Sequence, residues 1–242
     1  MRAKDVEFEV TFINLRDKPD WFLKISPHGK VPVLKVDEEI LFESNAIAEF
    51  LDETVPPRLH PEDPIQRARN RAWTDYVPTF SSALSGVYYT KTREDMEDGL
   101  AKAPKALERL EQAIAQGRGN DGPYFNGPML SLVDAAYAPF LQRFVVADRF
   151  LKTGLLDGFP YVKTWTDTLL SNDIITGAVA PNFLEEFYGN LKRREFYIAT
   201  LIDDSAVQAA EEQLWILLEP TTSPVRSRRS PDLTSAISTT GF

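Results

Sequence analysis

Four prolines fall within the eleven residues from Thr54 to Pro64. Proline has no backbone N–H and restricts the residue before it, so a helix cannot continue through such a segment. The hydrophobic pattern also changes here, because short strand-like and helical runs precede the segment and helical periodicity follows it. We therefore predict a stiff connector at 55–63 between a small αβ domain at 1–54 and an all-helical domain at 64–204.

The region before the connector is predicted to form a small sheet with short helices. Val6 to Ile13 alternates apolar and charged residues in its first half and is rich in β-forming residues, as in a strand with one buried face. Met1 to Lys4 resembles the last turn of a helix. Further strands are expected at 31–36 and 40–42, around an acidic turn, and helices at 20–25 and 44–52. The first of these helices would place Trp21, Phe22 and Ile25 on one side.

The region after the connector is helical in pattern. A glycine-rich stretch at 117–127 predicts a loop within it. Ser131 and Asp134 have the spacing of a capping box, which we interpret as a folding device rather than a catalytic pair. Helices are expected at 64–89, 93–116, 131–150, 161–170 and 181–202. The predicted fold class is therefore α+β, an αβ domain followed by an all-α domain.

The end of the chain has a different composition. From Pro220 onward, Ser, Thr and Pro make up 13 of 23 residues. Such a segment cannot bury enough apolar area to offset the entropy of ordering it. We expect an irregular or disordered tail at 205–242.

Composition narrows the chemistry and the partners. The formal charge of -9 and the pI near 4.9 argue against a nucleic-acid surface. The chain has no cysteine and only two histidines, His28 and His60, so we expect no metal site and no thiol nucleophile of its own. No apolar run approaches the roughly 20 residues that cross a bilayer, so we expect no membrane partner and a cytoplasmic location.

Glu43 and Ser44 lie where a predicted strand gives way to a helix. The unpaired amides and the dipole of a helix N-terminus favour an anion, and the Ser44 hydroxyl could add a donor. Glu43 could accept from an ammonium group, so the pair could bind both charges of an α-amino acid. The alternative is structural, with Ser44 as an ordinary N-cap.

Two further features near this junction could contact an extended ligand. Pro32 lies at the start of a predicted strand, and a cis Val31–Pro32 bond would leave the Val31 backbone free to pair with a peptide, although most such bonds are trans. Lys18 could supply a cation for a carboxylate at the far end of that ligand, although a solvated lysine is the default.

The segment from Phe12 to Glu53 resembles the thioredoxin-like N-terminal domain of the glutathione transferases, closest to the omega and related cysteine- or serine-type classes. The NLRDKPDWF segment, the VPVL turn and the Glu-Ser pair occur in the order and spacing of that family. The likeness continues through the connector and the SLVDAAYAPFLQR helix, so it covers about residues 2 to 202.

The resemblance implies a glutathione site. Lys18 would contact the glycyl carboxylate, Val31 would pair with the cysteinyl backbone with Pro32 cis, and Glu43 and Ser44 would bind the γ-glutamyl group. In the family a strand and a helix precede the equivalent of Val6, and the catalytic residue lies at the start of that helix. We therefore expect a chain truncated before its catalytic residue, which stays unknown.

The leading hypothesis is a glutathione transferase-like protein of detoxification. It would use glutathione as co-substrate for conjugation, or for thiol transfer, to a small hydrophobic electrophile, and the family implies a homodimer. The alternative is a catalytically impaired pseudo-transferase that acts as a binding or interaction protein. Tyr76, Tyr88 and Tyr89 are hydroxyl candidates, but aromatic residues at helical spacing more often form core. One helical face would be made of Trp73, Tyr76, Val77 and Phe80. It could line a hydrophobic co-substrate pocket between the domains or pack the interior, and we favour packing.

Overall fold

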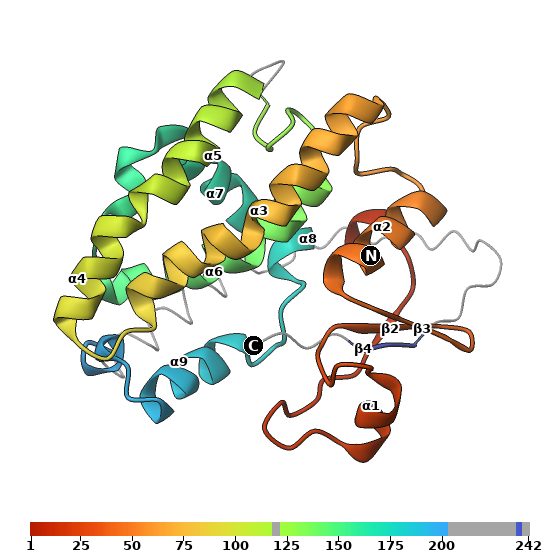
Figure 1. The fold of residues 1–242 in the computed structure, drawn as a ribbon, viewed down its shortest axis with the longest axis horizontal. Coiled ribbons are helices and arrows are strands. Elements are labelled where there is room, and N and C mark those ends of the chain that lie inside the picture. The colour runs from red at the N-terminus through yellow and green to blue at the C-terminus, as the bar shows by residue number, and fades with distance from the viewer. Residues whose placement is uncertain (118–121, 203–235, 239–242) are drawn as a thin grey trace. The chain divides into compact units, whose positions relative to one another are not determined.

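The chain divides into two compact units between Arg58 and Leu59, inside the connector expected at 55–63. The computed structural model describes residues 1–117, 122–202 and the backbone of 236–238 (Figure 1). Its N-terminal unit contains Met1–Arg58 together with the strand at 236–238. Its helical unit contains the described residues from Leu59 to 202.

The N-terminal unit is built on a four-stranded sheet with the order β1-β4-β2-β3. Its strands are β1 (Glu9–Val10), β2 (Val33–Val36), β3 (Glu39–Phe42) and β4 (Ala236–Ser238). β2 and β3 form an antiparallel hairpin in which Val36 pairs with Glu39. Asp37 begins the two-residue turn at a φ of 52°, a left-handed conformation that aspartate tolerates better than most residues. The hairpin confirms the acidic turn expected from the sequence.

Two strand expectations need correction. Of the strand expected at 6–13, only Glu9 and Val10 form a strand, β1. In the described structure these two residues pair only with the short β4. β4 itself falls inside the tail expected to be irregular, where the structure instead has a strand at Ala236–Ser238. The rest of that expected tail, from 205 onward, lies outside the described residues.

The helices of the N-terminal unit follow the sequence pattern closely. The short 3₁₀ helix η1 spans Arg2–Lys4, α1 spans Asp20–Ile25, and α2 spans Ser44–Thr54. Within α1, however, Phe22 is fully buried whereas Trp21 is 45% exposed. Consecutive helical positions point about 100° apart, so a helix of six residues cannot bury both rings equally well. The expectation that they share one side is therefore wrong for Trp21.

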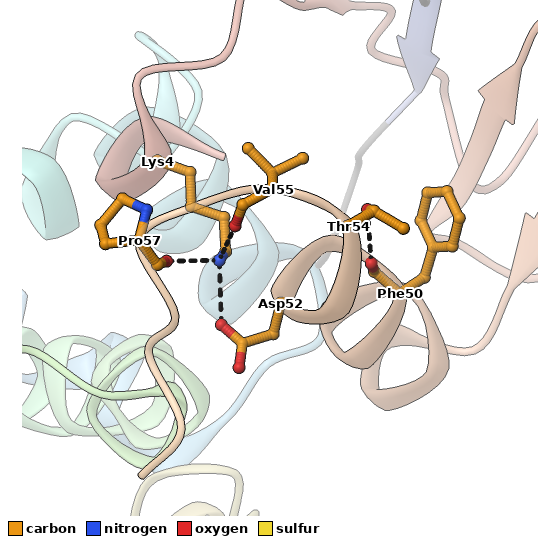
Figure 2. A network of polar contacts seen from close by, with 6 residues as sticks. All are labelled: Lys4, Phe50, Asp52, Thr54, Val55 and Pro57. Carbon is orange, nitrogen blue, oxygen red and sulfur yellow. Dashed lines mark hydrogen bonds and ion pairs between the residues drawn. The ribbon is translucent and has the colours of Figure 1, made fainter. Parts of the chain in front are cut away.

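Buried Lys4, near the start of the segment Met1–Arg58, contacts residues near the end of the same segment. The Lys4 Nζ donates to Asp52 Oδ1 at 2.9 Å and to the carbonyl oxygens of Val55 and Pro57 at 2.7 Å each (Figure 2). Only 1% of the Lys4 side chain is exposed. All three donors of the ammonium group are thus used, and η1 is tied to the C-terminal end of α2.

The helical unit packs around one apolar core. Its helices are α3 (Pro64–Tyr88), α4 (Arg93–Lys102), α5 (Pro104–Gly117), α6 (Leu132–Leu151), η2 (Leu155–Gly158), α7 (Pro160–Leu170), α8 (Asp173–Thr176), α9 (Phe183–Arg193) and η3 (Tyr197–Thr200). The single helix expected at 93–116 is two helices, because Pro104 has no amide to continue the first. The helix expected at 181–202 is α9 followed by η3, with Glu195 at a φ of 50° between them. Within the described ranges, no helix is long and apolar enough to span a membrane.

The capping box predicted at Ser131 and Asp134 is confirmed. The Asp134 carboxylate also accepts hydrogen bonds from Phe125 and Trp165, which lie outside α6. Asp134 Oδ2 accepts from the Ser131 amide at 2.7 Å and from the Ser131 hydroxyl at 2.6 Å. Asp134 Oδ1 accepts from the Phe125 amide at 2.9 Å and from Trp165 Nε1 at 2.6 Å. Burial raises the pKa of this carboxyl above its usual range, against the opposing effect of these hydrogen bonds. Asp134 therefore joins α6 to α7 and to the segment before Ser131.

Candidate functional site

A small pocket in the N-terminal unit lies where the loop after α1, the end of β3 and the start of α2 converge. Five of its residues belong to the loop that leads into β2, and the other three belong to the β3–α2 junction. The lining residues are Ser26, His28, Lys30, Val31, Pro32, Phe42, Glu43 and Ser44.

Hydrogen bonds of Ser26 close the loop on one side of the pocket. The buried Ser26 hydroxyl donates to the Lys30 carbonyl at 2.9 Å and accepts from the Lys30 amide at 3.0 Å. Gly29 occupies a φ of 59° within this loop, a conformation that suits glycine. The loop delivers the chain to Val31 and to Pro32, whose peptide bond is cis.

Removing the Ser26 hydroxyl is expected to loosen this loop. The Ser26→Ala change leaves the Lys30 amide and carbonyl without these partners, so we expect a loss of about 1–3 kcal/mol in the free energy of unfolding. Urea denaturation measures this loss. Thr54→Ala is the control, because the exposed Thr54 hydroxyl donates to the Phe50 carbonyl of its own helix. Equal stability of Ser26→Ala and wild type would show that these bonds do not hold the loop.

The other side of the pocket is an N-terminus of a helix with an unusual cap. Glu43 is the N-cap of α2 at a φ of 68° and a ψ of 119°. A residue with a side chain rarely adopts such a conformation, which costs about 1–3 kcal/mol and is typical of functional sites. Ser44 is the first helical residue, so the alternative in which it serves as the N-cap is wrong. Among the described residues, no side chain caps α2, and its first-turn amides remain available to an anion.

The charges around the pocket suit a zwitterion. Exposed Glu43 supplies a carboxylate, while the N-terminus of α2 and exposed Lys30 supply positive potential. The His28 ring meets the Phe42 ring edge to face, with centroids 5.4 Å apart, and both rings line the pocket. The site can therefore bind a molecule that carries both an ammonium group and a carboxylate.

The pocket contains four of the five residues proposed from the sequence as ligand contacts, namely Val31, Pro32, Glu43 and Ser44. Lys18 is half-buried next to Pro19, the N-cap of α1, and does not line the pocket. The contribution of each of the five to ligand binding stays a prediction. Sequence reasoning missed Ser26, Lys30 and Phe42, although a serine before a Pro-X-Gly turn is a signal for a side chain that closes a loop.

The tyrosine candidates belong to the core of the helical unit. Tyr88 is 2% exposed, and burial raises the pKa values of the Tyr88 and Tyr89 hydroxyls above their usual range, which disfavours phenolate. Tyr76 is partly buried, with the Arg109 guanidinium 5.7 Å from its ring centroid. The face made of Trp73, Tyr76, Val77 and Phe80 also packs against this core. These findings confirm the packing interpretation.

Two family models match the chain in the expected order. The model for the glutathione S-transferase N-terminal domain matches residues 1–53, and the model for the C-terminal domain matches residues 93–168. Probable glutathione S-transferase GSTU6 of Oryza sativa subsp. japonica is 31% identical over 74% of this chain and 80% of its own length. The chain belongs to the glutathione S-transferase family. Glutathione S-transferase omega-1 of Rattus norvegicus is 29% identical over 72% of this chain and 70% of its own length.

Solved structures of glutathione S-transferases share the fold. A trimeric glutathione transferase of Leishmania, TDR1, superposes with a TM-score of 0.67 over 80% of this chain and 45% of its own, at 23% identity. The tau-class enzyme of mango, Mangifera indica, superposes with a TM-score of 0.61 over 88% of this chain and 92% of its own, at 19% identity. The thioredoxin-like N-terminal domain and the helical C-terminal domain expected from the sequence are therefore confirmed.

Proposed function

We propose that this protein binds glutathione in the pocket of its N-terminal unit and acts as a glutathione transferase. The observation that carries the proposal is the convergence of Glu43, Ser44 and Val31 on one pocket at the N-terminus of α2. Membership of the glutathione S-transferase family supports the choice of ligand. So does a rice relative, OsGSTU1, whose structure was solved in complex with glutathione and which is 24% identical to this chain.

Each charged end of glutathione has a complement near the pocket. Glu43 would accept from the ammonium of the γ-glutamyl group, while the first amides of α2 and the Ser44 hydroxyl would donate to its carboxylate. The Val31 backbone would pair with the cysteinyl residue, as an added strand pairs with a sheet edge. Lys18 stays our candidate for the glycyl carboxylate, and Lys30, which lines the pocket, is a second candidate.

The reaction would be carried by the thiol of glutathione, because the chain has no cysteine. In conjugation, the thiolate attacks the electrophilic atom of a small hydrophobic molecule, and a thioether forms as the leaving group departs or the double bond takes up a proton. In thiol transfer, the thiolate attacks a disulfide and releases the other sulfur as a thiolate. No residue is assigned as catalytic. The homodimer and the cytoplasmic location also stay predictions.

Glu43→Gln is expected to weaken glutathione binding roughly 10- to 100-fold, because it replaces a charge-assisted hydrogen bond by a neutral one. Isothermal titration calorimetry with reduced glutathione measures the change. Glu39→Gln is the matched control, since Glu39 of β3 is likewise an exposed glutamate but does not line the pocket. Absence of wild-type binding at millimolar glutathione, or equal effects of the two changes, would overturn the proposed site.

Turnover is tested separately from binding. The purified chain should conjugate glutathione to an aromatic halide, or reduce a mixed disulfide with glutathione, above the rate without protein. Activity in either assay that also falls in Glu43→Gln supports the transferase. Binding without turnover in both assays would contradict the enzyme and select the pseudo-transferase.

A further inference from the structure

His28 lines the pocket but has no part in the contacts with glutathione proposed so far. It is the third residue of a turn in which the carbonyl of the first residue, Ser26, accepts from the Gly29 amide at 3.1 Å. Proline at the second position and glycine at the fourth are typical of such a β-turn. The hydrogen bonds between Ser26 and Lys30 close the same turn. The turn therefore holds exposed His28 at a defined place in the pocket lining.

A second contact holds the His28 ring from the sheet. The ring meets the Phe42 ring with 5.4 Å between centroids and 80° between planes, an edge-to-face arrangement that is attractive. Phe42 is the last residue of β3 and pairs with Val33 of β2, so it belongs to the hairpin rather than to the loop. The imidazole is thus held from two elements, unlike a loop side chain that only contacts water.

The charges of the pocket do not match those of glutathione while His28 is neutral. Of the described residues that line the pocket, Lys30 carries a positive charge and Glu43 a negative one, so the two cancel. The N-terminus of α2 adds only a partial positive charge. Glutathione has two carboxylates and one ammonium group, hence a net charge of about −1 at neutral pH. A protonated His28 would give the lining the surplus positive charge that complements this ligand.

We propose that His28 is a ligand-binding residue of the pocket and that its protonated imidazole donates to a carboxylate of the bound peptide. The inference rests on the proposed function, because it takes a γ-glutamyl peptide with surplus negative charge as the ligand. Histidine ordinarily changes its charge between pH 5 and 8, whereas carboxylates and amines ordinarily titrate outside that range. The protonated form binds the anion more tightly, so the affinity should rise as the pH falls through this range.

The probe for this test is S-methylglutathione, because its thioether neither titrates nor reacts as a thiol. Isothermal titration calorimetry at pH 5.5 and 7.5, at constant ionic strength, measures the affinity. Wild type should bind about three- to fivefold more tightly at pH 5.5, the size of one exposed ion pair. In His28→Gln the two affinities should differ by less than about twofold, since the amide does not titrate. Circular dichroism at both pH values verifies that each variant is folded.

A charge-retaining variant and the second histidine serve as controls. His28→Lys keeps its positive charge at both pH values, so at pH 7.5 it should bind about as tightly as wild type does at pH 5.5. His60, in the helical unit, is present in both variants, so any pH dependence that it causes would persist in His28→Gln.

The outcomes distinguish this inference from the proposed function. Equal wild-type affinities at the two pH values, or the same pH dependence in His28→Gln as in wild type, would overturn the role of His28 and leave the proposed glutathione site in place. Absence of S-methylglutathione binding at both pH values would overturn the proposed site itself, and the role of His28 with it.

Discussion

Replacing Asp134 with alanine is expected to destabilise the helical unit by at least about 3 kcal/mol, since three buried N–H donors lose their acceptor at about 1–3 kcal/mol each. These donors are the amides of Phe125 and Ser131 and the indole of Trp165. Asp134 is fully buried, so water cannot replace the carboxylate without opening the core. Domains are stable by only about 5–15 kcal/mol, so the loss should be a large part of the total. Guanidinium unfolding followed by circular dichroism measures it.

Two variants separate this network from ordinary helix capping. Asp134→Asn keeps one oxygen that can accept from Phe125 and Trp165, so it should lose less than Asp134→Ala. Asp95→Ala is the matched control, because Asp95 stands at the same position of α4, accepts from the Thr92 hydroxyl at 2.8 Å and is exposed. Its expected cost is about 1 kcal/mol or less. Equal losses in Asp134→Ala and Asp95→Ala would contradict a buried hub at Asp134.

The elements that the sequence predicted well are those specified by neighbouring residues. α1 occupies the expected residues 20–25, and the α6 cap depends on side chains only three positions apart. The β2–β3 hairpin likewise depends on two apolar runs and the acidic turn between them. In each case the alternation of apolar and polar residues, or the capping chemistry, is contained in one short window.

The features that escaped prediction depend on contacts between distant parts of the chain. β4 pairs with strands more than two hundred residues away, and no local pattern of three residues can specify such a partner. The bond from Trp165 to Asp134 also spans 31 positions.

The break between α4 and α5 is different, because Pro104 is a local signal for it. The helical periodicity on both sides of Pro104 concealed this signal.

In the candidate site, too, some features were predicted from neighbouring residues and others were not. The sequence predicted the strand-to-helix junction at Glu43 and Ser44. It did not predict the positive φ of Glu43, because glutamate rarely adopts a positive φ. Val31 and Pro32 were visible as a proline at the start of a strand. Lys30 was missed because a lysine in a loop resembles any surface lysine, and only the bonds from Ser26 place it at the pocket.

Replacing Lys4 with methionine is expected to destabilise the N-terminal unit by about 3–5 kcal/mol, the usual cost of removing one partner from a buried ion pair. Methionine preserves most of the apolar stem but removes the charge and all three hydrogen bonds to Asp52, Val55 and Pro57. The Asp52 carboxylate, 4% exposed, would lose the cation 2.9 Å away (Figure 2). Because α2 begins at Glu43 and Ser44, loosening its C-terminal end should also weaken glutathione binding.

Hydrogen exchange of peptides from α2, together with urea unfolding, measures the loss of stability in this unit. Lys35→Met is the matched control, because Lys35 belongs to the same unit and pairs with Glu38 only at 4.0 Å, with 47% of its side chain exposed. An exposed pair of this kind contributes about 0–1 kcal/mol. The double variant Lys4→Met/Asp52→Leu should recover part of the loss, since an apolar pair replaces a buried carboxylate that has lost its lysine. Equal effects of Lys4→Met and Lys35→Met would show that the buried lysine does not hold α2 in place.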